Sequence, residues 1–392
     1  MNSGGIDRRE FIKRAGMGAV GATLTVNAAG SLIDGPPAAD TAAPSQKPAK
    51  VKPAVEFRIL GKTGLKVSAV SYGAMRTRES EVIRYAIDKG INYLDTAHCY
   101  MNGDNEKIVA RALKGRRNKV YIATKVHIAP KQQMIESVQD SLKSLQTDYI
   151  DVVQLHGMSN AQQPQNAEAI EAMTAMKKKG LVRFCGVSTH KNQAEVIRGM
   201  IETKFYDIVM MSYNFKSPAA IKEAVARAAK AGLGVVAMKT QAGGYKEKKL
   251  GNLSPHAAAL KYILQDKNVH TTIPSMPAFN MVDENMQAMT GSLTFFDRRT
   301  LGLYGAAIAN RLCLMCGRCE GTCEQGVDIQ EALRHLMYYE AYGERQLAQS
   351  GYRQIPAAQS AEACFDCRKC SARCANGLKI KQQLVRAHRL LA

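Results

Sequence analysis

Eight short apolar runs, each followed by a longer stretch of helical period, constrain the fold of this chain most strongly. The eight runs are residues 67–72, 91–95, 120–124, 150–155, 182–188, 208–212, 233–238 and 269–274. The helical stretches between them include residues 81–89, 134–145, 168–179 and 219–231. Short β-rich runs that alternate with helices are typical of parallel strands joined by crossover helices. Eight such units predict an α/β fold, a (β/α)8 TIM barrel.

Glycine follows three of the helical stretches, at Lys89-Gly90, Lys179-Gly180 and Ala231-Gly232. A glycine there would end each helix in a left-handed cap. The alternative fold is a doubly wound parallel sheet, but no Gly-x-Gly-x-x-Gly follows the first run. With 392 residues, 46% of them hydrophobic and 22% charged, the chain has a globular composition and room for more than one domain.

Ionisable side chains stand at the ends of three predicted strands: Asp95, Lys125 and His156, with Tyr100 shortly after Asp95. Active sites of such barrels lie at the carboxyl ends of the strands, so we expect these four residues to meet. A tyrosine keeps its proton at neutral pH and can donate it to a carbonyl oxygen. We expect Lys125 to lower the pKa of Tyr100, Asp95 to hold Lys125 charged, and His156 to orient the carbonyl.

Around these positions the chain resembles the aldo-keto reductases. The similar stretches are residues 60–68, 90–97 with Tyr100, 124–125, 154–156 and 186–188. The resemblance implies a barrel domain over residues 55–296. It also implies an oxidoreductase that interconverts a small-molecule carbonyl and an alcohol, with Asp95, Tyr100, Lys125 and His156 as its catalytic residues.

The same resemblance implies a nicotinamide dinucleotide cofactor, NAD(P)(H). Ser188 matches the family's carboxamide-binding residue, and Tyr213 matches the ring that stacks on nicotinamide. Asn285 matches an adenine contact, and Lys239 stands at the seventh strand end, where it would meet a pyrophosphate.

Four positions depart from the family pattern. Met210 and Thr189 replace a glutamine and an asparagine, while Ser275 and Met281 stand where lysine and arginine grip a 2′-phosphate. Losing both cations removes the charge-assisted contacts that favour a phosphate. NADH, a weakly held cofactor or no nicotinamide cofactor therefore remain open.

Two identical cysteine runs hold eight of the ten cysteines of the chain. Each run reads Cys-x2-Cys-x2-Cys-x3-Cys, and together they comprise Cys313, Cys316, Cys319, Cys323, Cys364, Cys367, Cys370 and Cys374. Three thiolates at this spacing reach three corners of a [4Fe–4S] cube from one loop, while the fourth typically binds the other cluster. On that pattern Cys374 completes the first-run cluster and Cys323 completes the second.

Zinc and disulfides are the alternatives for these runs. Zinc ribbons use two Cys-x2-Cys pairs, so zinc would leave cysteines over, and cysteines two residues apart seldom bridge well. We predict two [4Fe–4S] clusters in a small, mostly α-helical, ferredoxin-like domain over residues 297–392, with helices at 331–347 and 381–391. A subset of the aldo-keto reductases carries such a domain. The two remaining cysteines, Cys99 and Cys185, are predicted to pack in the core.

The N-terminus resembles a twin-arginine export signal through Arg8-Arg9 and the residues around them. Residues 15–33 are uncharged but rich in glycine and alanine, which is too weakly apolar for a stable membrane span. We predict a signal peptide over residues 1–33 and a disordered linker over residues 34–54; a basic N-terminal arm is the alternative. This route carries folded cargo, which suits clusters inserted before export. It predicts a periplasmic protein, or one on the outer face of the cytoplasmic membrane.

The net charge of +20 is not accompanied by a basic and aromatic nucleic-acid motif, so we predict no nucleic-acid partner. A basic surface does suit an acidic redox partner protein. The sequence therefore supports two candidate functions. The first is an exported aldo-keto-reductase-type oxidoreductase with electrons relayed through two clusters. The second is an electron-transfer protein that uses the barrel as a docking scaffold. Clusters that only stabilise the C-terminal region are a third reading.

Overall fold

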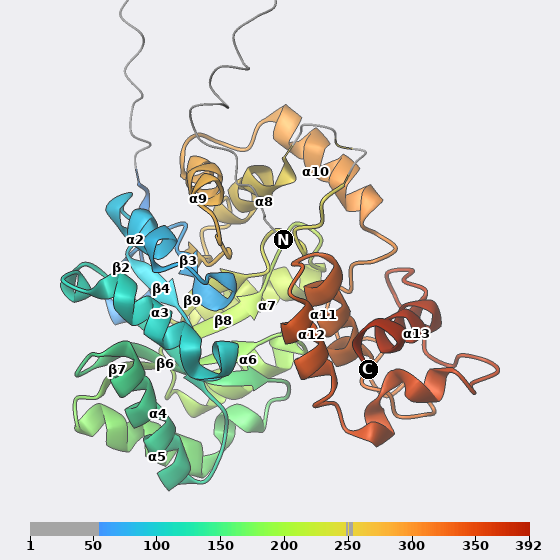
Figure 1. Ribbon diagram of the computed structural model, residues 1–392, viewed down its shortest axis with the longest axis horizontal. Coiled ribbons are helices and arrows are strands. Elements are labelled where there is room, and N and C mark those ends of the chain that lie inside the picture. The colour runs from blue at the N-terminus through green and yellow to red at the C-terminus, as the bar shows by residue number, and fades with distance from the viewer. Residues whose placement is uncertain (1–54, 248–249, 251–253) are drawn as a thin grey trace, which may run out of the picture. The chain divides into compact units, whose positions relative to one another are not determined.

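Eight parallel strands form one sheet that curls into a barrel in the computed structural model, which describes residues 55–247, 250 and 254–392 (Figure 1). In sequence order the strands are β3 (Tyr72–Gly73), β4 (Tyr93–Asp95), β5 (Tyr121–Val126), β6 (Ile150–Met158), β7 (Val182–Thr189), β8 (Ile208–Ser212), β9 (Gly234–Met238) and β10 (Thr271–Thr272). Each strand pairs with the next, and two isolated parallel bridges, Val70 to Thr272 and Gly73 to Ser275, join the first to the last. The predicted (β/α)8 barrel is therefore confirmed.

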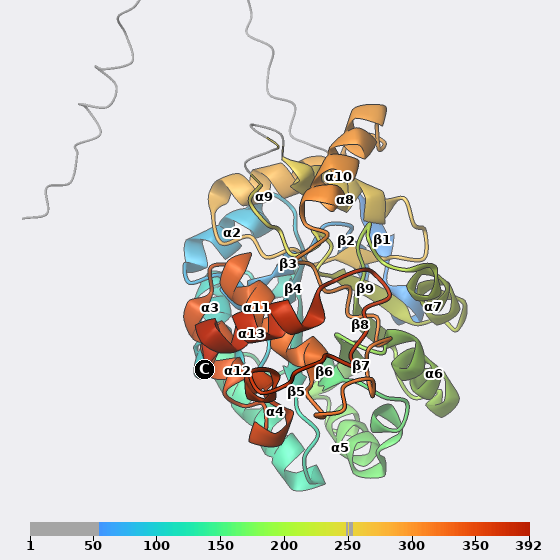
Figure 2. The same cartoon turned by 90° about the vertical axis from the view of Figure 1, so that its right-hand side faces the viewer.

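Helices surround the barrel and follow the strands in turn (Figure 2). They are α2 (Ser80–Asp88), α3 (Asp104–Leu113), α4 (Lys131–Leu145), α5 (Ala167–Lys178), α6 (Gln193–Thr203), α7 (Ala219–Lys230), α8 (Pro255–Leu264) and α9 (Phe279–Met286). Because successive strand residues point to opposite faces, each strand serves two cores. Tyr93 packs inside the barrel, whereas its neighbour Leu94 packs outward against the helices.

An antiparallel hairpin, β1 (Phe57–Ile59) with β2 (Lys66–Ser68), precedes the barrel. Its Leu60 and Val67 join the cluster inside the barrel. A Cβ on Gly61 would lie 2.3 Å from the backbone nitrogen of Gly234, so only glycine allows this close approach. The prediction of one strand over residues 67–72 is wrong, because residues 67–68 pair within the hairpin and the barrel strand begins at Tyr72.

The C-terminal region is helical, as predicted, and lies in front of the barrel strands in Figure 2. It contains α10 (Phe295–Ala307), α11 (Ile329–Glu340), α12 (Arg345–Tyr352) and α13 (Ile380–Leu391). The predicted single helix over residues 331–347 is wrong, because the chain turns at Gly343, whose φ is +70°, and this turn separates α11 from α12. The region has its own apolar core, which includes Leu333, Leu336 and Leu384.

All described residues belong to one compact unit of the chain. Within that described part, no helix is both long enough and apolar enough to cross a membrane. The predicted signal peptide (1–33) and linker (34–54) lie outside the described residues.

Candidate active site

The four residues predicted to be catalytic meet at one end of the barrel. Asp95 ends β4, Lys125 lies near the end of β5, and His156 lies towards the end of β6. Tyr100 begins a short 3-10 helix, Tyr100–Gly103, that follows β4. Neighbouring parallel strands therefore deliver all four side chains to their shared carboxyl end.

Lys125 and Asp95 form a buried ion pair at the centre of this group. The Lys125 ammonium lies 2.6 Å from Asp95 Oδ1 and donates a further hydrogen bond to the Thr96 carbonyl. Gln154 donates to the second carboxylate oxygen of Asp95 at 3.2 Å. Burial raises the pKa of Asp95, and the Lys125 charge opposes that rise. The added hydrogen bonds compensate for removing two charges from water.

Tyr100 lies against both Lys125 and His156. The Lys125 ammonium is 4.7 Å from the centre of the Tyr100 ring, and the His156 ring meets that ring edge-on at 5.9 Å. Burial raises the pKa of Tyr100 well above its usual range, and the negative charge of Asp95 adds to the rise. The expected lowering of this pKa is not seen as a net shift, because burial is the largest influence on it. The phenol holds its proton and is ready to donate it.

His156 is a neutral imidazole, because burial and the Lys125 charge hold its pKa well below the usual range. Cys99 Sγ lies 3.5 Å from His156 Nδ1, and the ring of His127 stacks on that of His156 with 4.8 Å between centres. Cys99 is exposed in the structure, which contradicts its prediction as a core residue, whereas Cys185 is buried as expected.

The residues expected to bind nicotinamide are dispersed. The hydroxyl of Ser188 donates to the Leu155 carbonyl and accepts from the Gly157 amide, so the backbone occupies it. Tyr213 does not line the site: its ring packs in the outer core and its phenol donates to Asp266 at 3.0 Å. Tyr213 directly follows the last residue of β8 and its ring points outward, so its prediction as a stacking ring is wrong.

Lys239 and Asn285 do lie near the barrel mouth. The Lys239 ammonium donates to the hydroxyl of Tyr338 at 3.0 Å. Its hydrogen-bond partner is therefore a residue of α11, whereas the sequence predicted a pyrophosphate. Asn285 accepts a hydrogen bond from Gln241 at 2.8 Å, and its own buried amide nitrogen has no partner among the residues that the structure describes.

Helix α11 covers the barrel mouth. Tyr338 and Tyr342 stack with ring centres 5.5 Å apart and line the same cavity as Asp95, Tyr100 and Lys239. The volume of this cavity is about 90 Å³. Pockets that bury larger organic ligands measure about 300–1,000 Å³, so the covered mouth has little space for a dinucleotide.

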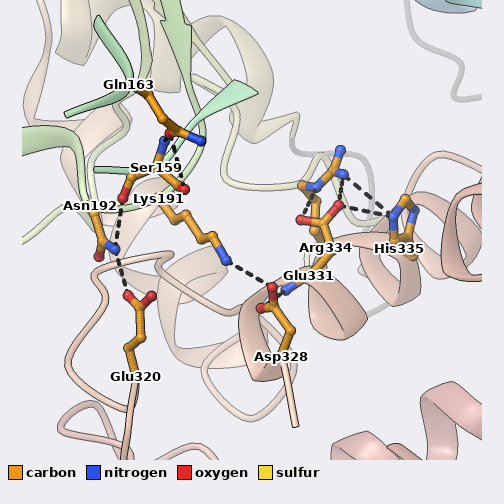
Figure 3. A network of polar contacts seen from close by, with 9 residues as sticks. All are labelled: Ser159, Gln163, Lys191, Asn192, Glu320, Asp328, Glu331, Arg334 and His335. Atoms are coloured by element: carbon orange, nitrogen blue, oxygen red, sulfur yellow. Dashed lines mark hydrogen bonds and ion pairs between the residues drawn. The ribbon is translucent and has the colours of Figure 1, made fainter. Parts of the chain in front are cut away.

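Two polar contacts join the barrel to the first cysteine run and to the N-terminal end of α11 (Figure 3). Lys191, after β7, forms an ion pair with Asp328 at 2.8 Å, and Asn192 donates to Glu320. Asp328 also caps α11 by accepting from the Glu331 amide, so one carboxylate serves both the helix and the docking contact.

Beyond the other end of α11, Glu344 pairs with Arg76 at 3.4 Å and with Arg78 at 3.2 Å. Arg76 also stacks its guanidinium over the Tyr342 ring at 4.8 Å. The helix is therefore held at both ends across the catalytic residues. The sequence carries a signal for this role, because Arg334 and Tyr338 lie four residues apart on one face of α11, and Tyr342 follows at the same spacing in the next turn.

The eight cysteines of the two runs assemble into two groups of four. Burial raises the pKa of the Cys313 thiol to about 12, and three nearby thiols add to the rise: Cys319, Cys316 and Cys374. Burial likewise raises the pKa of Cys364 to about 11, with contributions from Cys323, Cys370 and Cys367. Each group joins three cysteines of one run to the fourth cysteine of the other, the exchange that the spacing predicts.

These groups fit four-iron clusters better than the alternatives. Every cysteine among the described residues is a free thiol, which leaves the disulfide alternative without support. A tetrahedral zinc ion draws its sulfur ligands to within about 4 Å of one another. In the described part of the chain, these eight sulfurs form no group of three close enough to share a single metal ion. The wider spacing suits a cube with one iron at each corner.

Comparison with known proteins agrees with the barrel and its site. The model of the aldo/keto reductase family matches residues 69–252, which include all four catalytic candidates. The uncharacterized oxidoreductase YqkF of Bacillus subtilis (strain 168) is 34% identical over 174 residues, covering 40% of this chain and 56% of that protein. The methylglyoxal reductase DkgB of Salmonella typhi is 35% identical over 130 residues, covering 31% and 48%. The chain thus spans about half the length of these curated relatives.

Solved structures extend the match over the barrel. The apo form of aldo-keto reductase AKR11C1 from Bacillus halodurans is 30% identical, with a TM-score of 0.53 over 64% of this chain and 96% of that one. An aldo-keto reductase from Klebsiella pneumoniae in complex with NADPH shares the fold at 23% identity, with a TM-score of 0.54 over 64% of this chain and 95% of that one. The barrel, the site at its mouth and these matches together place the chain in the aldo/keto reductase family.

Proposed function

We propose that this protein interconverts a small-molecule carbonyl and its alcohol at the barrel mouth, and that two [4Fe–4S] clusters in the C-terminal region relay the electrons. The shared cavity carries this proposal, because Asp95 and Tyr100 from the barrel line it together with Tyr338 of α11 and Tyr342 of the turn that follows α11. Helix α11 follows the first cysteine run in the chain. The acid–base residues and the cluster-binding region thus meet at one place.

Each catalytic side chain has a role that its surroundings support. Tyr100 keeps its proton and donates it to the carbonyl oxygen during reduction. Neutral His156 can donate a hydrogen bond to the same oxygen and orient it. Lys125, held by Asp95, places a positive charge beside the Tyr100 ring and stabilises the phenolate left after proton transfer. Carbonyl reduction consumes two electrons and two protons. The two clusters, when bound, would pass the electrons singly from an external reductant, and a proton from water would complete the new C–H bond.

A freely exchanging nicotinamide cofactor fits this chain poorly. Tyr213 points away from the cavity, the hydroxyl of Ser188 is bonded to the backbone, and Lys239 is bonded to Tyr338. We therefore propose that the reaction does not use hydride from NAD(P)H. Anaerobic purification followed by extraction of bound nucleotide tests this: a stoichiometric dinucleotide would contradict it.

The Tyr100→Phe substitution tests the proposed chemistry. Carbonyl reduction with a reduced viologen as the electron donor should fall by at least about 100-fold, because the general acid is lost. Methylglyoxal is a suitable first substrate, since a relative is a methylglyoxal reductase. Tyr121→Phe is the matched control, because Tyr121 lies at the opposite end of β5. Unchanged turnover in Tyr100→Phe would rule out this tyrosine as the acid.

A basic groove favours binding of a redox partner. It also supports the second candidate function, in which the protein transfers electrons and the barrel serves as a docking scaffold. The groove has a volume of about 1050 Å³, lies along α13 and is walled in part by Cys370 and Cys374, one cysteine from each group. Of the described residues that line it, six are basic and none is acidic: Arg311, Arg373, Lys379, Lys381, Arg386 and Arg389. An acidic partner would dock there by charge complementarity.

Turnover distinguishes these two functions. A pure electron-transfer protein would accept electrons from an acidic [2Fe–2S] ferredoxin, at a rate that falls with salt, yet would reduce no carbonyl. An oxidoreductase would do both, and only its carbonyl turnover would depend on Tyr100.

We also propose export by the twin-arginine route to the periplasm, or to the outer face of the cytoplasmic membrane. The support is Arg8-Arg9 with the weakly apolar segment that follows. Replacing both arginines by lysine should keep the folded, cluster-containing protein in the cytoplasm. Continued export of that variant would contradict this proposal.

A further inference from the structure

Three side chains that commonly bind transition metals lie together beside Tyr100. Of the three, only His156 has a role in the proposed carbonyl chemistry. They are Cys99, His127 and His156, and one ligand atom of each lies within 4.8 Å of the others. Cys99 immediately precedes Tyr100, His127 directly follows β5, and His156 lies on β6. Three segments that are far apart in the sequence thus bring a thiol and two imidazoles to the same strand ends.

The spacing of these atoms is close to that of a metal site. A tetrahedral ion with bonds of about 2.0–2.3 Å holds its ligand atoms about 3.5 Å apart. Cys99 Sγ and His156 Nδ1 already lie 3.5 Å apart. The remaining pairs, which lie within 4.8 Å, need to contract by up to about 1.3 Å, which side-chain rotation allows. Three protein ligands with a fourth position open to solvent are the arrangement of accessible zinc sites.

The surroundings permit a cation to enter and to stay. Cys99 and His127 are exposed and His156 is half-buried, so an ion can arrive from solvent. Lys125 and Arg334 both place positive charge near Cys99 and His156, but Lys125 is paired with Asp95 and Arg334 with Glu331. Binding would also convert the Cys99 thiol to a thiolate, which adds a negative charge at the site.

We propose that Cys99, His127 and His156 bind a divalent transition metal ion such as Zn²⁺, and that the bound ion occupies the position of the substrate carbonyl. The inhibition that follows rests on the proposed carbonyl chemistry, whereas the binding itself does not. Because His156 would be a metal ligand, it could no longer orient a carbonyl, and Zn²⁺ would compete with substrate.

Zinc titration of the anaerobic, cluster-containing protein tests the site directly. We expect one Zn²⁺ per chain by calorimetry, and a zinc-edge X-ray absorption spectrum with one sulfur and two imidazole ligands. Cys99→Ala and His127→Gln should each weaken binding by at least about tenfold. His98→Gln is the matched control, because His98 is the neighbouring imidazole outside the group, and it should bind Zn²⁺ normally.

Several outcomes would overturn the proposal. They are equal Zn²⁺ affinity in Cys99→Ala and the parent protein, a sulfur-rich zinc spectrum, or loss of iron during the titration. The last two would mean that zinc occupies the cluster cysteines. If Zn²⁺ binds at Cys99 but does not compete with substrate, the proposal that the ion occupies the carbonyl position is wrong. The proposed carbonyl chemistry would not be affected by that result. Absent turnover together with normal Zn²⁺ binding would instead count against the proposed function.

Discussion

Two tyrosines in one cavity have opposite protonation preferences. Tyr100 is partly buried near Asp95, and its pKa is raised well above the usual range. Burial would also raise the pKa of Tyr338, but Lys239 and Arg334, each 3.0 Å from its hydroxyl oxygen, lower that pKa to about 8. The cavity therefore contains one phenol that keeps its proton and one that can lose its proton near neutral pH. Such a pair is suited to moving a proton between the barrel and α11.

The titration of Tyr338 can be measured directly. Because the folded pKa lies below the usual value of 10, the phenolate forms as the pH rises through about 8. Ultraviolet difference spectra should show one tyrosine ionising there, and Tyr338→Phe should remove that transition. Tyr100→Phe serves as the control and should retain it. A transition that survives in Tyr338→Phe would assign the ionisation to another residue.

Two glycines within helices differ in how much space surrounds them. Gly199 lies within α6, and a Cβ there would stand 2.1 Å from the carbonyl oxygen of Ala161. Gly302 lies within α10, and a Cβ there would have nothing within 4 Å. The first glycine is required by a close backbone approach, whereas the second only adds conformational entropy to the unfolded chain.

Alanine substitution should separate these two cases. Gly199→Ala should destabilise the protein by about 1–3 kcal/mol, because the Ala161 backbone must move. Gly302→Ala should stabilise it by up to about 1 kcal/mol, through better helix propensity. Thermal unfolding followed by circular dichroism should show a lower melting temperature for the first variant and an equal or higher one for the second. Similar shifts in both variants would contradict the close contact.

Local patterns in the sequence predict the barrel elements well and the covered mouth poorly. Asp95, Lys125 and His156 could be placed because strand ends follow from apolar runs, and parallel strands share one carboxyl end. The outward direction of Tyr213 depends on the register just past β8, which a run of apolar residues does not specify. The contact of Lys239 with Tyr338 joins residues 99 positions apart. This contact depends on how α11 packs against the barrel, and no local sequence pattern predicts that packing.

At the scale of the whole molecule, the cysteine exchange links two distant segments of the chain. Cys374 lies near Cys313, while Cys323 lies near Cys364. If clusters fill both groups, each one ties the segment after α10 to the segment before α13. Cluster assembly and folding of the C-terminal region would then depend on each other. Because α11 lies between the two runs, loss of either cluster should also loosen the cover over Tyr100.

The exchange makes a prediction that distinguishes it from two independent runs. In Cys374→Ala the cluster held by Cys313, Cys316 and Cys319 loses its fourth ligand, so iron should fall from about eight atoms per chain towards about four. Anaerobic alkylation and peptide mapping should then find Cys313, Cys316 and Cys319 modified. The ligands of the second cluster should stay protected: Cys323, Cys364, Cys367 and Cys370. Cys323→Ala is the reciprocal control and should reverse the pattern. Modification of the second-run thiols in Cys374→Ala would show that each run binds its own cluster.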